Sequence, residues 1–187
     1  MSTCARCAVR ADRTPHVPVI YVDSDVYLDL IMRSKDEHAD TGEERWKSAK
    51  ELFDAINANQ VRLAASALVE AEVLCNGETR RRSDDVRSRI RGWFNAASTL
   101  WTDVDRFLAR DAAALAEKYS HLRDDMGTKM RAADATHLAA AIRLHADYLM
   151  THDRGFPLGI TIDGVEVTRP RVVWTQSLFD EEEISDR

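Results

Sequence analysis

Four acidic residues stand where this chain could most readily do chemistry. Asp23 directly follows one apolar run, and Asp153 lies just beyond another. Glu72 and Asp134 each fall in the first turns of an expected helix. Taken singly these positions are ordinary, because carboxylates are favourable near helix N-termini and Asp is common in turns. A functional interpretation therefore requires that the four carboxylates converge.

Converging carboxylates would repel one another, and their pKa values would rise unless a cation were bound. A hard divalent ion, Mg²⁺ or Mn²⁺, held through oxygen ligands with several waters retained, removes that repulsion. Such an ion can activate water and offset charge on a phosphoryl oxygen, which is the chemistry of phosphodiester hydrolysis. We therefore predict a metal site made by Asp23, Glu72, Asp134 and Asp153.

Alternating strands and helices would bring these acids to one edge of a sheet. Four apolar runs have the length and composition of strands: 19–22, 61–65, 100–104 and 147–151. Stretches of helical spacing separate them, and Ser66, Ser83 and Asp105 are placed as N-caps. This order predicts an α/β fold with a mostly parallel sheet, in which the carboxyl ends of the strands share a ligand-binding edge.

Helical geometry separates the two glutamates of the helix that Ser66 opens. That helix is predicted to stop at Gly77, with Glu72 near the buried edge and Glu70 pointing about 160° away. In the later alanine-rich helix, Asp134 and His145 are predicted to share one face.

The C-terminal part carries two more strand signals. Alternation around Asp163-Gly164 over residues 160–167 predicts a β-hairpin, and the run 171–174 predicts a last strand. The predicted organisation is an irregular extension at 1–18, one domain at 19–178 and an acidic tail at 179–187.

Composition limits the classes of function. The chain has 187 residues, a formal charge of −6 and a pI near 5.5, so its overall field would not attract nucleic acid, and any such contact needs a local basic patch. Without an apolar run of about 18 residues or a signal peptide, the expected compartment is the cytoplasm, with no membrane span. Cys4 and Cys7 form a C-x-x-C, but a second ligand pair is missing, which disfavours zinc or redox chemistry.

Arginine makes up six of the twelve residues from Arg80 to Arg91. A solvated helix face is the favoured interpretation of such a run. The alternative is a ridge that contacts RNA phosphates, because the arginine guanidinium matches phosphate oxygens. Its candidate residues are Arg80, Arg81, Arg82 and Arg87, which could instead receive an acidic segment of a protein partner.

Four strings of the chain carry a family resemblance: Tyr21-Val22-Asp23-Ser24, Ser66-Ala67-Leu68-Val69-Glu70-Ala71-Glu72, Ala133-Asp134-Ala135-Thr136-His137-Leu138-Ala139-Ala140-Ala141, and Thr151-His152-Asp153-Arg154-Gly155-Phe156. In this order they resemble the four acidic motifs of PIN-domain nucleases, most closely the VapC-type toxins of toxin–antitoxin pairs. The resemblance covers about residues 19–175. Any one motif alone is weak, whereas four in order are specific.

The resemblance implies a three-layer α/β/α fold and a metal-dependent endoribonuclease, usually a homodimer, that a small antitoxin neutralises. It makes Asp23, Glu72, Asp134 and Asp153 the metal-site acids. Ser24 and Thr151 match residues that would orient ligands or water.

Three features depart from the family pattern: the long connection at 33–45, the N-terminal extension and the enlarged C-terminal hairpin. They concern antitoxin fit and substrate choice more than the metal site. The alternative function is a PIN-like binding or regulatory module with a weak metal site, and the presence of all four acids favours the enzyme. A DNA-directed flap nuclease would need further acids and DNA-binding appendages.

Overall fold

The computed structural model describes residues 16–123, 127 and 129–174. Most of the predicted N-terminal extension, with Cys4 and Cys7, lies outside these residues, as does the acidic tail. Within the described residues, no helix combines the length and the apolar character needed to cross a membrane.

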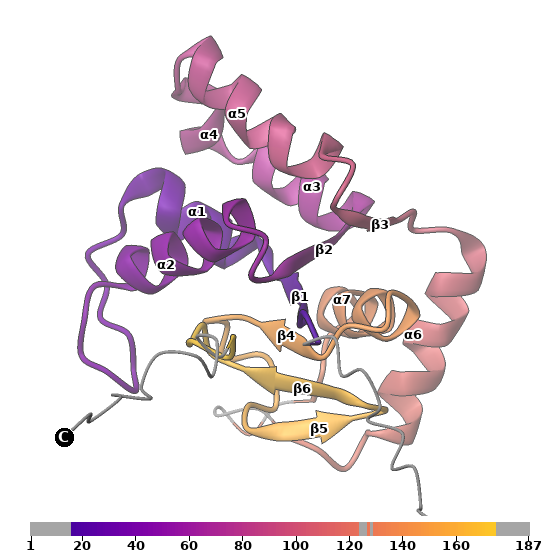
Figure 1. Cartoon of the computed structure of the whole chain (residues 1–187). Helices are drawn as coiled ribbons and strands as arrows, with labels where there is room; N and C mark the ends of the chain where they lie inside the picture. The colour runs from indigo at the N-terminus through magenta and orange to yellow at the C-terminus, as the bar shows by residue number, and fades with distance from the viewer. Residues whose placement is uncertain (1–15, 124–126, 128, 175–187) are drawn as a thin grey trace, which may run out of the picture.

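A single six-stranded sheet forms the centre of the molecule (Figure 1). Its strands are β1 (Val19–Val22), β2 (Arg62–Ser66), β3 (Leu100–Thr102), β4 (Tyr148–Met150), β5 (Ile160–Ile162) and β6 (Val165–Thr168). They lie in the order β3-β2-β1-β4-β6-β5, and every neighbouring pair is parallel except β5 with β6. The predicted mostly parallel sheet is confirmed.

Helices cover both faces of this sheet. They are α1 (Ser24–Met32), α2 (Arg45–Asn57), α3 (Ala67–Cys75), α4 (Gly77–Arg81), α5 (Asp84–Asn95), α6 (Arg106–Lys118) and α7 (Ala132–Arg143). The chain steps from β1 to β2 to β3 through α1–α5, then returns across the sheet to β4 through α6 and α7. Because parallel crossovers are right-handed, this reversal places α6 and α7 opposite α1 and α2, as Figure 1 shows.

The reversal of strand order occurs at β1, between β2 and β4. Helices from opposite faces diverge at such a point and leave a crevice at the carboxyl ends of the strands. Ile20, Tyr21 and Val22 of β1 are fully buried, so this strand is firmly anchored in the core. Asp23 follows it directly and projects from a fixed backbone.

The predicted hairpin at 160–167 is confirmed as β5 and β6. Both turn residues, Asp163 and Gly164, have positive φ angles of 44° and 92°. Asp-Gly suits a two-residue turn of this kind, because both positions need left-handed backbone.

Two local predictions were wrong, and one short helix was missed. Residues 171–174 form no strand. The β5–β6 hairpin already occupies the edge of the sheet beyond β4, and Trp174 is buried in the core instead. The helix that Ser66 opens ends before Gly77 as predicted, with Asn76 as its C-cap, but the short helix α4 that follows was missed; the Asn76 side chain starts it by accepting from Glu78 N at 2.9 Å. His145 lies beyond α7, exposed and with a φ of 52°, so it does not share a face with Asp134.

Candidate active site

All four predicted acids line one pocket of about 570 Å³ at the carboxyl edge of the sheet. Asp23 comes from the end of β1, Glu72 from α3 and Asp134 from α7, while Asp153 lies on the loop after β4. Ser24 lines the same pocket, and Glu70 does not. Glu72 therefore reaches the pocket, whereas Glu70, two residues earlier on α3, does not, as helical geometry predicts.

The Asp23 carboxylate is held by two short hydrogen bonds. Its Oδ1 accepts from Ser24 N and its Oδ2 accepts from Thr151 Oγ1, both at 2.7 Å. Burial raises the pKa of Asp23, and the charge of His137 and the Thr151 hydrogen bond only partly counter it. The carboxylate is thus fixed in direction but poorly solvated as an anion.

Thr151 joins the first acid to the last. Besides donating to Asp23, its Oγ1 accepts from Asp153 N at 2.9 Å. The Asp153 side chain in turn accepts from Gly155 N at 2.8 Å, which closes the turn. A Cβ on Gly155 would lie 3.3 Å from Asp134 Oδ2 and 3.4 Å from both Asp153 carboxylate oxygens, so the two carboxylates pack against the bare glycine.

Asp134 has a structural partner as well as a place in the pocket. Its Oδ2 accepts from Arg131 N at 3.0 Å, which caps the start of α7. Burial raises the pKa of Asp134, and the charges of Asp153 and Asp23 raise it further. The hydrogen bond from Arg131 N explains where the Asp134 carboxylate points, but it does not remove the repulsion between Asp134 and the other acids.

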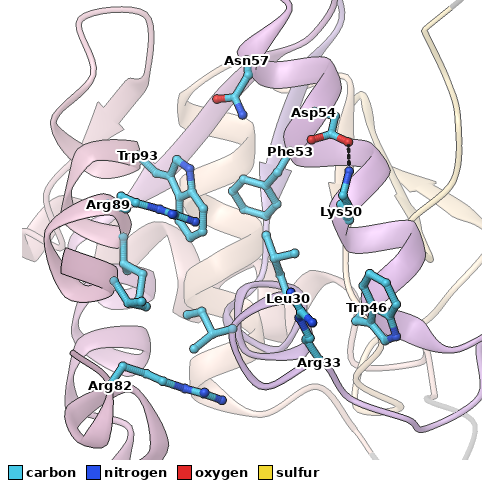
Figure 2. Close-up of a pocket in the computed structure, with 13 residues that line it drawn as sticks. Leu30, Arg33, Trp46, Lys50, Phe53, Asp54, Asn57, Arg82, Arg89 and Trp93 are labelled. Carbon is cyan, nitrogen blue, oxygen red and sulfur yellow. Dashed lines mark hydrogen bonds and ion pairs between the residues drawn. The ribbon is translucent and has the colours of Figure 1, made fainter. Parts of the chain in front are cut away.

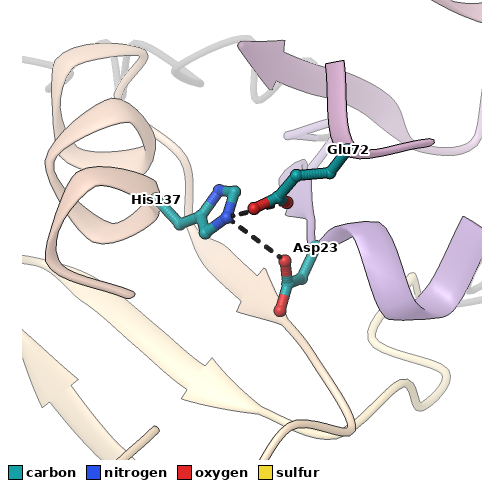
Figure 3. A group of neighbouring side chains, drawn as sticks. All are labelled: Asp23, Glu72 and His137. Carbon is teal, nitrogen blue, oxygen red and sulfur yellow. Dashed lines mark ion pairs between the residues drawn. The ribbon is translucent and has the colours of Figure 1, made fainter. Parts of the chain in front are cut away.

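His137 is a member of the site that the sequence reasoning missed. Its Nε2 lies 3.2 Å from Glu72 Oε2 and 3.6 Å from Asp23 Oδ1, as Figure 3 shows. Burial lowers the pKa of His137, but contact with Glu72 and the charge of Asp23 outweigh burial and raise it. Burial likewise raises the pKa of Glu72, but His137 lowers it overall. The sequence held one weak signal for His137: it comes three residues after Asp134, and residues three apart on a helix lie on the same side.

Asp25 was also missed. Its Oδ2 accepts from His152 N at 2.8 Å, while its Oδ1 is buried without a hydrogen-bond partner among the described residues. Burial raises the pKa of Asp25 well above its ordinary value, and the charges of Asp23 and Asp29 add to the shift. It lies two residues after Asp23, in the first turn of α1, and an acid there gave no signal beyond ordinary helix-start chemistry.

The donor set suits a divalent cation. Within the part of the chain that the structure describes, two buried carboxylate oxygens in this pocket, Asp25 Oδ1 and Glu72 Oε2, have no hydrogen-bond partner, although Glu72 Oε2 lies 3.2 Å from His137 Nε2. Buried polar atoms are seldom left so. Carboxylate oxygens together with one imidazole are ligands that Mg²⁺ or Mn²⁺ can use.

Cations line this pocket too, but not those the sequence singled out. Its arginines are Arg45, Arg131 and Arg154. None of the predicted RNA-contacting arginines lines it; Arg81 pairs with Glu78 and Arg87 with Asp84, each along its own helix.

A second pocket, of about 720 Å³, lies between α1, α2 and α5 (Figure 2). Leu30, Phe53 and Trp93 give it an apolar floor, and its cationic residues are Arg33, Lys50, Arg82 and Arg89. Lys50 is paired with Asp54 at 2.5 Å. We call this pocket the helical groove.

Replacing Asp25 tests the repulsion in the site. Because its pKa is raised in the folded protein, the folded state keeps this proton where the unfolded chain has lost it, and the free energy of unfolding falls as pH rises above the ordinary value of 3.8. Asp25→Asn removes this penalty and should stabilise the metal-free protein at pH 7, by an amount on the order of 1 kcal/mol.

Urea unfolding in a chelator, at pH 7 and below pH 4, measures the effect. The advantage of Asp25→Asn should shrink as pH falls below 3.8, because the unfolded chain then becomes protonated at this residue as well. An equal difference at both pH values would instead assign it to packing.

The chain was compared with protein families and with known proteins. The model of the PIN domain matches residues 20–158. No curated protein sequence matches the chain.

Several solved structures are similar to it. The VapBC2 complex of Rickettsia felis, bound to a DNA fragment from its promoter, has 13% identity and a TM-score of 0.53, over 81% of this chain and 98% of that one. FitAB bound to a DNA fragment has 16% identity and a TM-score of 0.50, over 84% and 96%. Mycobacterium tuberculosis VapC20, a toxin that cleaves the sarcin-ricin loop, has 18% identity and a TM-score of 0.48, over 72% and 89%.

At these identities the VapBC2 and FitAB structures support the fold alone. The family match spans most of the chain, including the four acids at the carboxyl edge. The chain belongs to the PIN-domain family.

Proposed function

We propose that this protein is a metal-dependent endoribonuclease and the toxin of a toxin–antitoxin pair. The observation that carries the proposal is the convergence of Asp23, Glu72, Asp134 and Asp153 on one pocket that leaves Glu72 Oε2 buried without a hydrogen bond. PIN-domain membership and the toxin complexes among the similar structures support it. The cytoplasmic location and the homodimer stay predictions.

The four acids would hold Mg²⁺ or Mn²⁺. When bound, that ion supplies Lewis-acid stabilisation of phosphoryl charge and lowers the pKa of a water that attacks the phosphorus. Asp23 is fixed for this task by Ser24 N and Thr151 Oγ1, so it binds with little reorganisation. Thr151 also holds the backbone of Asp153, which couples the position of the last acid to that of the first.

Arg131 and Arg154 supply the positive charge that an RNA phosphate needs beside an acidic site. Both are exposed and both line the acidic pocket. A phosphate entering the pocket would meet these guanidinium groups at the rim and the acids within. We call them the pocket arginines and propose that they orient the RNA backbone.

The helical groove is proposed as the antitoxin site. Its apolar floor suits the apolar face of a helix, and Arg82 and Arg89 suit acidic residues beside that face. Of the arginines predicted to contact RNA, Arg82 is thereby proposed to bind a protein partner instead.

Single-turnover cleavage of structured RNA with Mn²⁺ tests the activity. Asp23→Asn and Asp153→Asn should each lower the rate at least about 100-fold, because the ion they help to hold contributes several kcal/mol of transition-state stabilisation. Glu70→Gln is the matched control and should cleave at nearly the wild-type rate, since Glu70 does not line the pocket.

Cleavage by Asp23→Asn at the wild-type rate would mean a contaminating nuclease or another active site, and would end the assignment. Metal binding without RNA cleavage, in a folded protein that still captures its partner, would favour the binding-module alternative.

Two double variants separate RNA from partner. Arg131→Gln with Arg154→Gln should weaken RNA binding and flatten its salt dependence, by roughly 0.7 in log–log slope per lost phosphate contact with single-stranded RNA. Arg82→Gln with Arg89→Gln should cleave normally but escape inhibition by the antitoxin encoded beside it.

If Arg82→Gln with Arg89→Gln flattens the salt dependence of RNA binding instead, RNA crosses α5. The RNA contact then belongs to the arginine run and no longer to Arg131 and Arg154. The positions of Arg80, Arg81 and Arg87 outside the acidic pocket argue for the first outcome.

A further inference from the structure

His137 is a buried histidine that lies between two acids of the acidic pocket. Its side chain is 4% exposed, and its ring points from α7 toward the carboxylates of Asp23 and Glu72 (Figure 3). One ligand atom from each of these three residues lies within 4.8 Å of the other two. Nothing in a PIN-type set of four acids requires a nitrogen atom here.

The far side of the imidazole is fixed by a buried hydrogen-bond chain. Nδ1 lies 3.0 Å from Tyr21 Oη, which lies 2.7 Å from Ser66 Oγ. Both hydroxyls can donate or accept, so the chain can take a proton on Nδ1 and leave a lone pair on Nε2. Metal-binding histidines commonly hold their second nitrogen in this way, which sets the tautomer and the ring direction.

The spacing of the donors also fits. Neighbouring ligands of an octahedral ion with bonds of about 2.1 Å lie about 3 Å apart. Nε2 is 3.2 Å from Glu72 Oε2 and 3.6 Å from Asp23 Oδ1. Glu72 Oε2 is buried and makes no well-directed hydrogen bond among the described residues, which leaves it available to an ion.

We propose that His137 Nε2 is a metal ligand together with Asp23 and Glu72, and that this nitrogen makes the site prefer Mn²⁺ or another first-row transition ion to Mg²⁺. The physical reason is that Mg²⁺ favours oxygen ligands and gives up water reluctantly, whereas imidazole suits transition ions. The inference rests on the acidic site of the proposed function and specifies its chemistry.

The competing role for His137 is purely structural: a protonated ring that holds the two carboxylates by charge. That role also places Nε2 near Glu72 and Asp23, so activity of the His137 variants does not separate the two. Direct detection of nitrogen on the ion does, because a ring that only holds the acids cannot ligate.

Pulsed electron paramagnetic resonance of bound Mn²⁺ provides that detection. The wild-type protein should show modulation from a coordinated ¹⁴N nucleus, and His137→Gln should lose it while still binding Mn²⁺. His145→Asn is the matched control: His145 is exposed beyond α7, asparagine tolerates its positive φ, and the nitrogen signal should persist.

His152 is the other histidine that lines the pocket, and its Nε2 lies 3.9 Å from Asp29 Oδ2. A nitrogen signal that survives in His137→Gln would therefore come from His152 and would overturn the proposal. So would Mn²⁺ bound by the wild type without any nitrogen coupling.

Calorimetric titration adds an independent readout. The wild type should bind Mn²⁺ at least about tenfold more tightly than Mg²⁺, and His137→Gln should reduce that ratio severalfold by exchanging nitrogen for an amide oxygen. A ratio unchanged by the substitution would contradict the proposal.

Metal binding by the acids and ligation by His137 can be disproved separately. If Mn²⁺ binds and Asp23→Asn abolishes binding but no nitrogen is coordinated, the acidic site stands and His137 is structural. If Mn²⁺ does not bind the wild type at all, both the metal site and the ligand assignment fall.

Discussion

Repulsion among carboxylates at the end of β1 is the constraint on which the site depends. Burial raises the pKa values of Asp23, Asp25 and Asp134, and the charge of at least one neighbouring acid raises each of them further. Two unit charges 4 Å apart repel by about 4 kcal/mol at an effective dielectric constant near 20. A fold that brings them together without a counterion loses stability, so the grouping is best understood as a cation site.

The fold imposes this grouping through topology. Strand order reverses at β1, so α3 and α7 approach the same crevice from opposite faces of the sheet and contribute Glu72 and Asp134 to it. Thr151, at the end of the neighbouring strand β4, then links Asp23 to Asp153 through one hydroxyl. Positions far apart in the sequence are thereby fixed by backbone rather than by long flexible side chains.

Local pattern was enough to predict much of this. Asp23 follows an apolar run, and Asp163-Gly164 specifies a turn, so the first strand and the hairpin could be read directly. His137 could not, because a histidine among alanines on a helix is usually a core residue, and only the folded chain shows Tyr21 fixing its ring. The prediction of a strand at 171–174 was wrong because several segments compete for the edge of a sheet, and β5 and β6 occupy it here. A local sequence pattern does not contain the outcome of that competition.

Thermal melting with increasing Mn²⁺ or Mg²⁺ tests the central claim that the acids form a cation site. An ion at 100 times its dissociation constant stabilises the folded state by about 2.7 kcal/mol, which corresponds to a rise of several degrees for a domain of this size. The wild type should show that rise, and Asp134→Asn should lose most of it. A melting temperature indifferent to both ions, up to several millimolar, would contradict the account.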